Sequence, residues 1–248
     1  MASGGRLFPF ALVTLFLFLI SPSPSLSSDD DKVNLSVYYE SLCPGSADFI
    51  ADYLVKTFET DLINIINLRM VPWGNARIDN RTGAFICQHG EDECYLNTIQ
   101  ACAIDVWSDQ KRHFNFIRCV ERNISKGGLQ SGKVSAVYQE KSSNVAALKV
   151  WESCAEEQKL EEADIYKCYT SGRGRELELR YKTETDQLIP PHEYTPWVAV
   201  NNQPLYDDFL NFIHHVCKAY KGGPAKPLAC NSARRGANSA VRGADEAR

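Results

Sequence analysis

Cys43 is the residue whose type and position point most directly to chemistry. It opens the run Cys43-Pro44-Gly45-Ser46, between an apolar strand-like segment and a helix-like segment. At the start of a helix, unpaired backbone N–H groups and the positive end of the helix dipole favour a thiolate over a thiol. Because the thiolate is the form that attacks disulfides, we predict that Cys43 is a redox nucleophile. The alternative is that Cys43 is one end of a structural disulfide.

Ser46 stands where a dithiol enzyme has its second cysteine, three residues after the first. A hydroxyl group does not exchange with disulfides, so this motif could not resolve a mixed disulfide formed on Cys43. Complete reduction would then need an external thiol, such as glutathione or free cysteine. The hydroxyl of Ser46 could instead form a hydrogen bond with the Cys43 thiolate.

The other cysteines indicate a framework of disulfides. The chain has nine cysteines, so at least one thiol is unpaired within a monomer. If Cys43 is free, four bridges can join the other eight, in pairings that the sequence does not choose. Cys230 is the rival for the odd thiol and could instead join two chains. The candidates for structural disulfides are Cys87, Cys94, Cys102, Cys119, Cys154, Cys168, Cys217 and Cys230.

A second group of chemically active residues lies between Cys87 and Cys102. Its cysteines could be zinc ligands, with His89 as a fourth. Structural zinc sites usually use closely spaced cysteine pairs, and the spacings of seven and eight residues here are wider. Disulfides are the more common use of such cysteines in a secreted chain, so we predict no metal and no other cofactor. His89 is then either a proton shuttle or a structural histidine.

The segments around Cys43 predict a β-α-β unit. Val33 to Tyr39 alternates apolar and polar residues and favours a strand. Ala47 to Phe58 has an apolar helical face, and Ile63 to Val71 is typical of a second strand. A strand, a helix and a parallel strand make a right-handed unit that begins an α/β sheet.

Helical periodicity prevails from Glu91 to about Ala163, and β character returns after it. The later segments predict a short strand at Glu176–Lys182, a hairpin turning at Asn201-Asn202, and a closing helix over Tyr206–Tyr220. The order is therefore β-α-β, a helical insertion at about 91–170, and β-β-α. The expected helices of the insertion are Phe114–Arg122, Ser131–Gln139, Asn144–Glu157 and Glu161–Tyr169.

Residues 1–27 are predicted to be a signal peptide. Arg6 precedes an apolar run over Leu7–Ile20, and Ser25-Leu26-Ser27 offers small residues for cleavage. The run is shorter than the roughly 20 residues that span a bilayer, which disfavours an uncleaved anchor. We expect the mature chain to have no membrane span. Glycosylation sequons at Asn34, Asn80 and Asn123 also point to the secretory pathway.

Charge divides the chain into an acidic body and a basic end. The formal net charge is −4, although residues 218–248 are rich in Lys and Arg. An acidic body argues against nucleic-acid binding. Residues 223–248 have little to bury and predict a disordered tail, which leaves 28–222 as one folded domain.

The run Cys87-Gln88-His89-Gly90-x-x-Glu93-Cys94-x-x-Asn97-x-x-x-x-Cys102 resembles the signature of the gamma-interferon-inducible lysosomal thiol reductase family. The resemblance extends over about residues 33–220. It implies a thioredoxin-like fold and reduction of protein disulfides in an acidic lysosomal or vacuolar lumen. The family's C-x-x-C motif begins at Cys43, and this sequence departs from that motif at Ser46.

The resemblance also implies a role for Thr195-Pro196. Thioredoxin-like folds place a cis-proline opposite the active cysteine, where it helps to bind substrate, and Pro196 matches that position. The next residue, Trp197, could be a core aromatic or could line a substrate groove, and we favour the core.

Three functions are compatible with these residues. The first is a monothiol oxidoreductase that acts on disulfide-containing proteins through Cys43, with glutathione or cysteine as the external thiol. The second is a redox chaperone or binding module that captures clients as mixed disulfides or holds them without a covalent bond. The third is a secreted scaffold in which Cys43 is bridged. Lysosome, vacuole and extracellular space all remain open as the final compartment.

Overall fold

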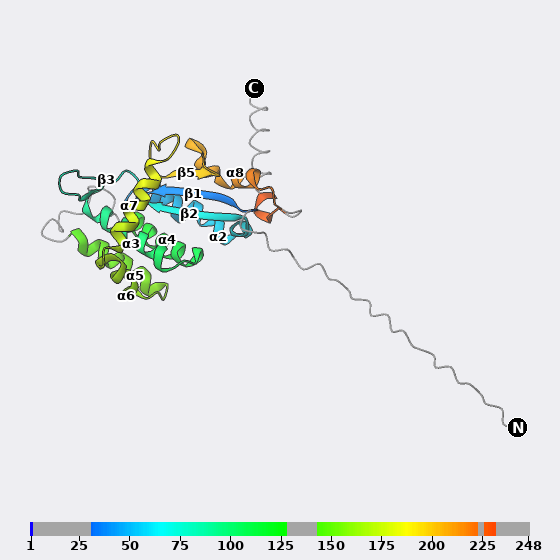
Figure 1. Ribbon diagram of the computed structural model, residues 1–248, viewed down its shortest axis with the longest axis horizontal. Coiled ribbons are helices and arrows are strands. Elements are labelled where there is room, and N and C mark those ends of the chain that lie inside the picture. The colour runs from blue at the N-terminus through cyan, green and yellow to red at the C-terminus, as the bar shows by residue number, and fades with distance from the viewer. Residues whose placement is uncertain (2–30, 128–142, 223–225, 232–248) are drawn as a thin grey trace.

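The computed structural model describes Met1 and residues 31–127, 143–222 and 226–231. At its centre is a four-stranded sheet with the strand order β2-β1-β5-β6. Strand β1 (Val33–Tyr39) pairs in parallel with β2 (Ile66–Pro72) and antiparallel with β5 (Trp197–Val200). The short strand β6 (Gln203–Pro204) forms the other edge (Figure 1).

A helical connection joins the two parallel strands and confirms the predicted β-α-β unit. It consists of α1 (Pro44–Asp48), the π-helical η2 (Phe49–Leu54), α2 (Lys56–Glu59) and the 3-10 helix η3 (Asp61–Ile65). The predicted start of the second strand at Ile63 was three residues too early. The Thr60 hydroxyl accepts a hydrogen bond from Leu62 N and caps η3, so the chain becomes extended only at Ile66.

Among the described residues between β2 and β5, five helices form the insertion, and Figure 1 shows them on one side of the sheet. A small hairpin of β3 (Arg77–Ile78) and β4 (Phe85–Ile86) precedes them. Stacked rings of Phe58 and Phe114 join the insertion to α2. The helices are α3 (Glu91–Val106), α4 (Gln110–Gly127), α5 (Ser143–Glu157), α6 (Glu162–Thr170) and α7 (Arg173–Asp186).

The strand predicted at Glu176–Lys182 was wrong, because this segment lies within α7. Alternating Leu177, Leu179 and Tyr181 gave it a strand-like pattern. Leu177 and Tyr181 are four residues apart, so a helix buries both on one face. The insertion therefore ends at 186 rather than near 170.

The chain then returns to the sheet as predicted. Asn201 and Asn202 have φ values of 48° and 63° and turn the β5–β6 hairpin. The predicted closing helix is divided into the 3-10 helix η5 (Tyr206–Asn211) and α8 (Phe212–Ala219). The ring of Phe49 in η2 makes edge-to-face contacts with Phe209 of η5 and Phe212 of α8. These contacts pack the first helical connection against the last helices of the chain.

Part of the predicted disordered tail is attached to the folded unit. Cys230 is buried and forms a disulfide with Cys217 of α8. The Asp61 carboxylate accepts hydrogen bonds from the backbone N–H groups of Leu228 and Ala229. The predicted signal peptide, the predicted helix Ser131–Gln139 and residues 232–248 lie outside the described residues.

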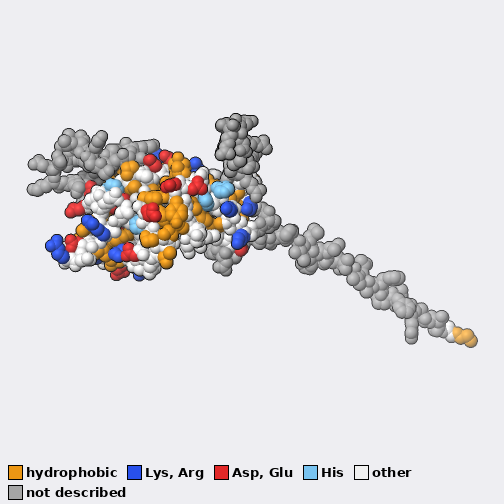
Figure 2. Space-filling model, turned by 90° about the horizontal axis from the view of Figure 1, so that it is seen from above, with side chains coloured by type: hydrophobic (Ala, Val, Ile, Leu, Met, Phe, Trp, Pro, Cys, Tyr) orange, Lys and Arg blue, Asp and Glu red, His pale blue; other side chains and the backbone are white. Residues whose placement is uncertain are grey.

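The described helices include none that is both long enough and apolar enough to cross a membrane. Figure 2 shows one face of the molecule, on which apolar side chains gather in the middle with carboxylates among them. Basic side chains on this face lie toward its ends.

Candidate active site

Cys43 lies at the junction between the central strand and the first helix. It is the N-cap residue of α1, with extended backbone angles, and Pro44 occupies the first turn. Its carbonyl accepts a hydrogen bond from Ala47 N at 2.9 Å, which begins the helix. Pro44 is tolerated because the first-turn N–H groups have no intrahelical partner. The half-buried thiol is the free cysteine of the structure.

The loop before β5 brings Thr195 and Pro196 against Cys43. Thr195 Oγ1 lies 3.4 Å from Cys43 Sγ, and the backbone oxygen of Thr195 lies 3.8 Å from it. The Thr195-Pro196 peptide bond is cis. A Cβ atom added at Gly45 would stand 3.6 Å from Pro196 Cδ, so the start of α1 packs directly on this loop.

Ser46 does not form the possible hydrogen bond with Cys43. Its side chain is fully buried within α1, and its Oγ has no hydrogen-bond partner. The third position after Cys43 is therefore turned into the protein, while Thr195 supplies the hydroxyl beside Cys43. Trp197 is buried, in agreement with a core role, and its ring meets Tyr194 and Tyr206 edge to face.

Glu40, three residues before Cys43, extends the site inward. Its Oε1 lies 3.2 Å from Thr195 Oγ1, and its Oε2 accepts a hydrogen bond from Asn75 N at 2.7 Å. The Glu40 side chain is buried. Gly74 has φ +56°, and a Cβ there would stand 2.4 Å from Glu40 Oε2. Only glycine therefore lets the backbone close over this carboxylate.

His89 and Glu93 continue the same cluster. His89 Nδ1 lies 2.6 Å from Glu93 Oε2 and 3.7 Å from Glu40 Oε1. His89 N also donates to Glu93 Oε2 at 2.7 Å. Burial, reinforced by the negative charge of Glu40, raises the pKa of Glu93 to about 8. At acidic pH, Glu93 is therefore a neutral carboxylic acid.

These three side chains could each offer one ligand atom to a metal, with the atoms within 4.8 Å of one another. Hydrogen bonds already engage His89 Nδ1 and Glu93 Oε2. Cys87 and Cys94 form a disulfide, so the alternative of a zinc site using their thiolates is wrong.

Farther from Cys43, a buried polar chain joins β1 to the insertion. Tyr39 donates its hydroxyl hydrogen to Gln100 Oε1 at 2.6 Å. The amide nitrogen of Gln100 donates to Ser41 Oγ and to Glu121 Oε1. Burial raises the pKa of Glu121 to about 7 and that of Glu178 well above its usual value. The interior beneath the site is thus rich in carboxyl groups.

The eight remaining cysteines form four disulfides, and Cys230 is among the paired ones. The pairs are Cys87–Cys94, Cys102–Cys168, Cys119–Cys154 and Cys217–Cys230. Three of them lie in the insertion or at its start, and the fourth joins α8 to residue 230. The alternative in which Cys43 is bridged does not agree with this pairing.

The three sequon asparagines lie apart from Cys43. Asn34 is in β1, and its Oδ1 accepts a hydrogen bond from the side chain of Asn67. Asn80 is exposed in the β3–β4 turn, and Asn123 is exposed on α4. Their glycosylation stays a prediction.

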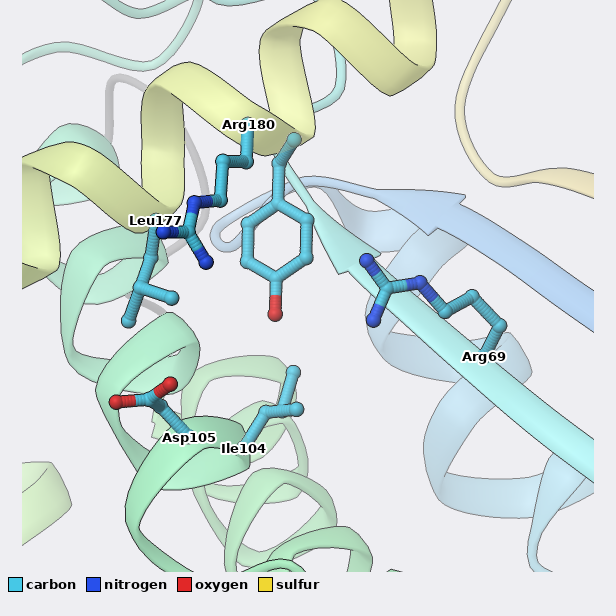
Figure 3. A pocket seen from close by; sticks show the side chains of 6 residues that line it. Arg69, Ile104, Asp105, Leu177 and Arg180 are labelled. Atoms are coloured by element: carbon cyan, nitrogen blue, oxygen red, sulfur yellow. The ribbon is translucent and has the colours of Figure 1, made fainter.

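A surface pocket lies between the edge strand β2 and helices α3 and α7 (Figure 3). Its lining contains none of the residues placed around Cys43. The six lining residues are Arg69, Ile104, Asp105, Leu177, Arg180 and Tyr181.

Sequence reasoning singled out Cys43, Pro196 and His89, but gave no role to Glu40, Glu93 or the hydroxyl of Thr195, which lie in the same cluster. A charged residue at the end of an apolar strand, shortly before Cys43, was the available signal for Glu40. Glu93 was part of the quoted signature and was given no role.

The strands and helices of the core follow the order β-α-β and β-β-α, with a helical insertion between them. A cysteine at the start of the first helix faces a cis-proline. Together these features define a thioredoxin-like thiol–disulfide oxidoreductase fold. BdbD from Bacillus subtilis has a similar fold, with a TM-score of 0.51 and 14% identity over 79% of this chain and 92% of that one. A structure of alpha-DsbA1 from Wolbachia pipientis gives a TM-score of 0.50 and 13% identity, covering 81% of this chain and 93% of that one. The prediction of a thioredoxin-like α/β fold is therefore confirmed.

The family description "Gamma interferon inducible lysosomal thiol reductase (GILT)" matches residues 34–158, and the chain belongs to this family. A "Gamma-interferon-responsive lysosomal thiol protein" of Arabidopsis thaliana is 43% identical, covering 81% of this chain and 76% of the relative. A "Gamma-interferon-inducible lysosomal thiol reductase" of Mus musculus is 35% identical, covering 86% and 77%. Family and fold together support a thiol reductase role for this chain.

Proposed function

We propose that the protein is a monothiol oxidoreductase of the secretory pathway that reduces or isomerises protein disulfides through Cys43. The observation that carries this proposal is the position of Cys43. It is unpaired, half-buried at a helix start, and lies 3.4 Å from the hydroxyl of Thr195, beside Pro196. The thiolate of a cysteine is the species that attacks disulfides, so an unpaired cysteine at this position is the candidate nucleophile.

The proposed reduction takes place in balanced steps. The Cys43 thiolate attacks one sulfur of a substrate disulfide, forms a mixed disulfide and releases the other sulfur as a thiolate. A small thiol such as glutathione then attacks the Cys43 sulfur and releases the second substrate thiol. A second small thiol regenerates Cys43 and leaves as the oxidised dimer of the small thiol. Pro196, next to Thr195, is proposed to help position the substrate segment.

The substitution Cys43→Ser tests this function, with Ser46→Ala as the matched control. Both variants change one atom or group in the same motif, but only the first removes the thiol. We expect glutathione-dependent reduction of a disulfide-containing protein to be lost in Cys43→Ser and retained in Ser46→Ala. Undiminished turnover in Cys43→Ser would refute the proposal. Alkylation of the unreduced native protein should label Cys43 and no other cysteine.

A second candidate function is capture of clients as stable mixed disulfides. It is favoured by Ser46, whose buried hydroxyl has no hydrogen-bond partner and supplies no resolving thiol. Millimolar glutathione should discriminate between the two. Rapid release of a trapped substrate supports catalysis, and mixed disulfides that persist under these conditions support capture.

We also propose a lysosomal or vacuolar lumen as the working compartment. Four disulfides suit an oxidising secretory route, and the names of the Arabidopsis thaliana and Mus musculus relatives contain the word lysosomal. A fluorescent fusion that carries the complete N-terminal segment should accumulate in that compartment, and cytosolic fluorescence would contradict the proposal.

A further inference from the structure

The surface pocket between β2, α3 and α7 has both apolar and hydrogen-bonding groups in its lining. Its volume is about 290 Å³, at the lower end of the range for small-molecule sites. Ile104 of α3 and Leu177 of α7 contribute apolar side chains. Arg69, Arg180 and Tyr181 contribute N–H and O–H donors. The pocket therefore has the size and the mixed lining of a site for a small molecule.

Two of the charged side chains in the lining are already paired with groups outside the pocket. Arg69 donates to the two carboxylate oxygens of Glu184, at 3.2 and 2.6 Å. Asp105 accepts two hydrogen bonds from the guanidinium group of Arg173, at 3.1 and 2.6 Å. Arg180, by contrast, forms no ion pair with any residue that the structure describes. Its positive charge is therefore available to a bound anion.

The direction of the Arg180 side chain suits it to this role. Figure 3 shows the guanidinium groups of Arg180 and Arg69 directed toward the pocket from opposite sides, one from α7 and the other from β2. A guanidinium group is planar and presents its N–H groups as a fork that matches the two oxygens of a carboxylate. A carboxylate in this pocket can therefore accept two parallel hydrogen bonds from Arg180.

Tyr181 adds a neutral hydroxyl group to the same lining. Its side chain is buried, and the guanidinium carbon of Arg69 lies 5.1 Å from the centre of its ring. This cation–π contact holds the ring in place. Burial raises the pKa of Tyr181 to about 12, so the hydroxyl keeps its hydrogen at neutral and acidic pH. A neutral hydroxyl can donate a hydrogen bond to an anion, whereas a phenolate would repel it.

We propose that this pocket is a binding site for a small organic carboxylate with an apolar body. The carboxylate pairs with Arg180 and accepts a hydrogen bond from the Tyr181 hydroxyl. The apolar body contacts Ile104 and Leu177, which an inorganic oxyanion such as phosphate would leave uncovered. Because the lining contains none of the residues around Cys43, this site is separate from the proposed thiol chemistry and goes beyond it.

The test is a ligand-observed NMR titration of the protein, with its disulfides intact, at neutral pH. The probes are benzoate and benzamide, which have nearly the same shape but differ in charge. We expect benzoate to bind about tenfold more tightly than benzamide, the factor for one hydrogen bond between charged groups. Arg180→Gln should weaken benzoate binding by about the same factor. Arg180→Lys keeps the charge without the fork and should lose less. Tyr181→Phe should weaken benzoate binding roughly fivefold.

Arg122→Gln is the matched control, because it removes an exposed arginine on α4, which does not line the pocket. It should bind benzoate as the natural protein does. Equal affinities for benzoate and benzamide, or undiminished benzoate binding in Arg180→Gln, would overturn the inference. Inorganic phosphate that binds more tightly than benzoate would also overturn it. Arg180 is exposed, so its variants should fold, and they decide if Tyr181→Phe does not. Benzoate binding needs no thiol, so binding without disulfide turnover would refute the proposed function alone.

Discussion

Thr195 Oγ1 lies 3.4 Å from Cys43 Sγ, although 152 residues separate the two in the chain. Cys43 follows the central strand β1, and Thr195 directly precedes the cis-proline before β5. Because β1 and β5 are antiparallel neighbours, the end of one strand meets the start of the other. The pairing of Tyr38 with Trp197 fixes this register, so the sheet itself brings the two halves of the site together.

The substitution Ser46→Cys should convert the motif to a dithiol. Residue 46 lies in α1 three positions after Cys43, where a thiol could attack a mixed disulfide from within the protein. We expect a trapped mixed disulfide to disappear without added glutathione in this variant and to persist in the natural protein. Gel analysis under non-reducing conditions measures its lifetime, and equal lifetimes would argue against Ser46 as the missing resolving position.

Stability should fall as the pH rises from about 5 to 8. Burial raises the folded-state pKa of Glu121 to about 7 and that of Glu93 to about 8, from ordinary values near 4.5. Groups with a raised folded pKa stabilise the fold fully below the unfolded pKa, and this stabilisation is lost as pH rises through the folded pKa. The free energy of unfolding should therefore be largest at acidic pH, which suits the proposed compartment.

Glu121→Gln isolates part of this effect, because glutamine keeps the shape of the acid without its charge. Urea unfolding should show a smaller loss of stability between pH 5 and pH 8, by on the order of 2 kcal/mol. Glu156→Gln, at an exposed position on α5, is the control and should leave the pH dependence unchanged. If the stability of Glu121→Gln keeps the full pH dependence of the natural protein, the Glu121 carboxyl group stays ionised in the fold.

The sequence was sufficient for the parts of the site that are local in the chain. A cysteine between a strand and a helix follows from residues 33–58, and the β5–β6 turn follows from Asn201-Asn202. The surroundings of the Glu40 and Ser46 side chains depend on the direction in which each side chain points, just after β1 and in α1. Burial decides that direction, and burial is set by the insertion and by the loop before β5.

The wrong prediction of a strand at Glu176–Lys182, which lies in α7, has a similar cause. Apolar residues at 177, 179 and 181 fit a period of two, while 177 and 181 also fit one helical face. Packing against α3 resolves this ambiguity, since Gly174 and Leu177 are buried on the same side of α7. A short segment with both periodicities cannot be assigned until its partner is known.

The disulfide Cys102–Cys168 should contribute more stability than Cys217–Cys230. The first closes a sequence separation of 66 residues between α3 and α6, and the second closes 13. Loop-closure entropy gives about 4 kcal/mol for the longer loop and about 3 kcal/mol for the shorter one. Paired alanine substitutions of each bridge, compared by urea unfolding, test the order. A larger loss for the shorter loop would mean that contacts of residues 226–231 outweigh chain entropy.

Gly174→Ala should destabilise the protein even though alanine favours helices. Gly174 lies in the first turn of α7, where an added Cβ would stand 2.5 Å from Thr98 Cγ2 and 3.1 Å from Cys102 Sγ. The gain in helix propensity is about 1 kcal/mol, whereas overpacking of a filled core costs about 1–3 kcal/mol. Thr98 is on α3 and Cys102 is held by its disulfide, so the sulfur side of this contact cannot yield easily.

Gly45→Ala is the matched comparison for Gly174→Ala, because its added Cβ would meet Pro196 Cδ and the Thr195 oxygen at 3.6 Å, an ordinary contact distance. It should leave the free energy of unfolding nearly unchanged. Adding Thr98→Ser to Gly174→Ala removes the methyl group that the new Cβ meets, and part of the lost stability should return. If Gly174→Ala is as stable as the natural protein, α7 can move away from α3 at little cost. The close approach of these helices would then not be what requires glycine at 174.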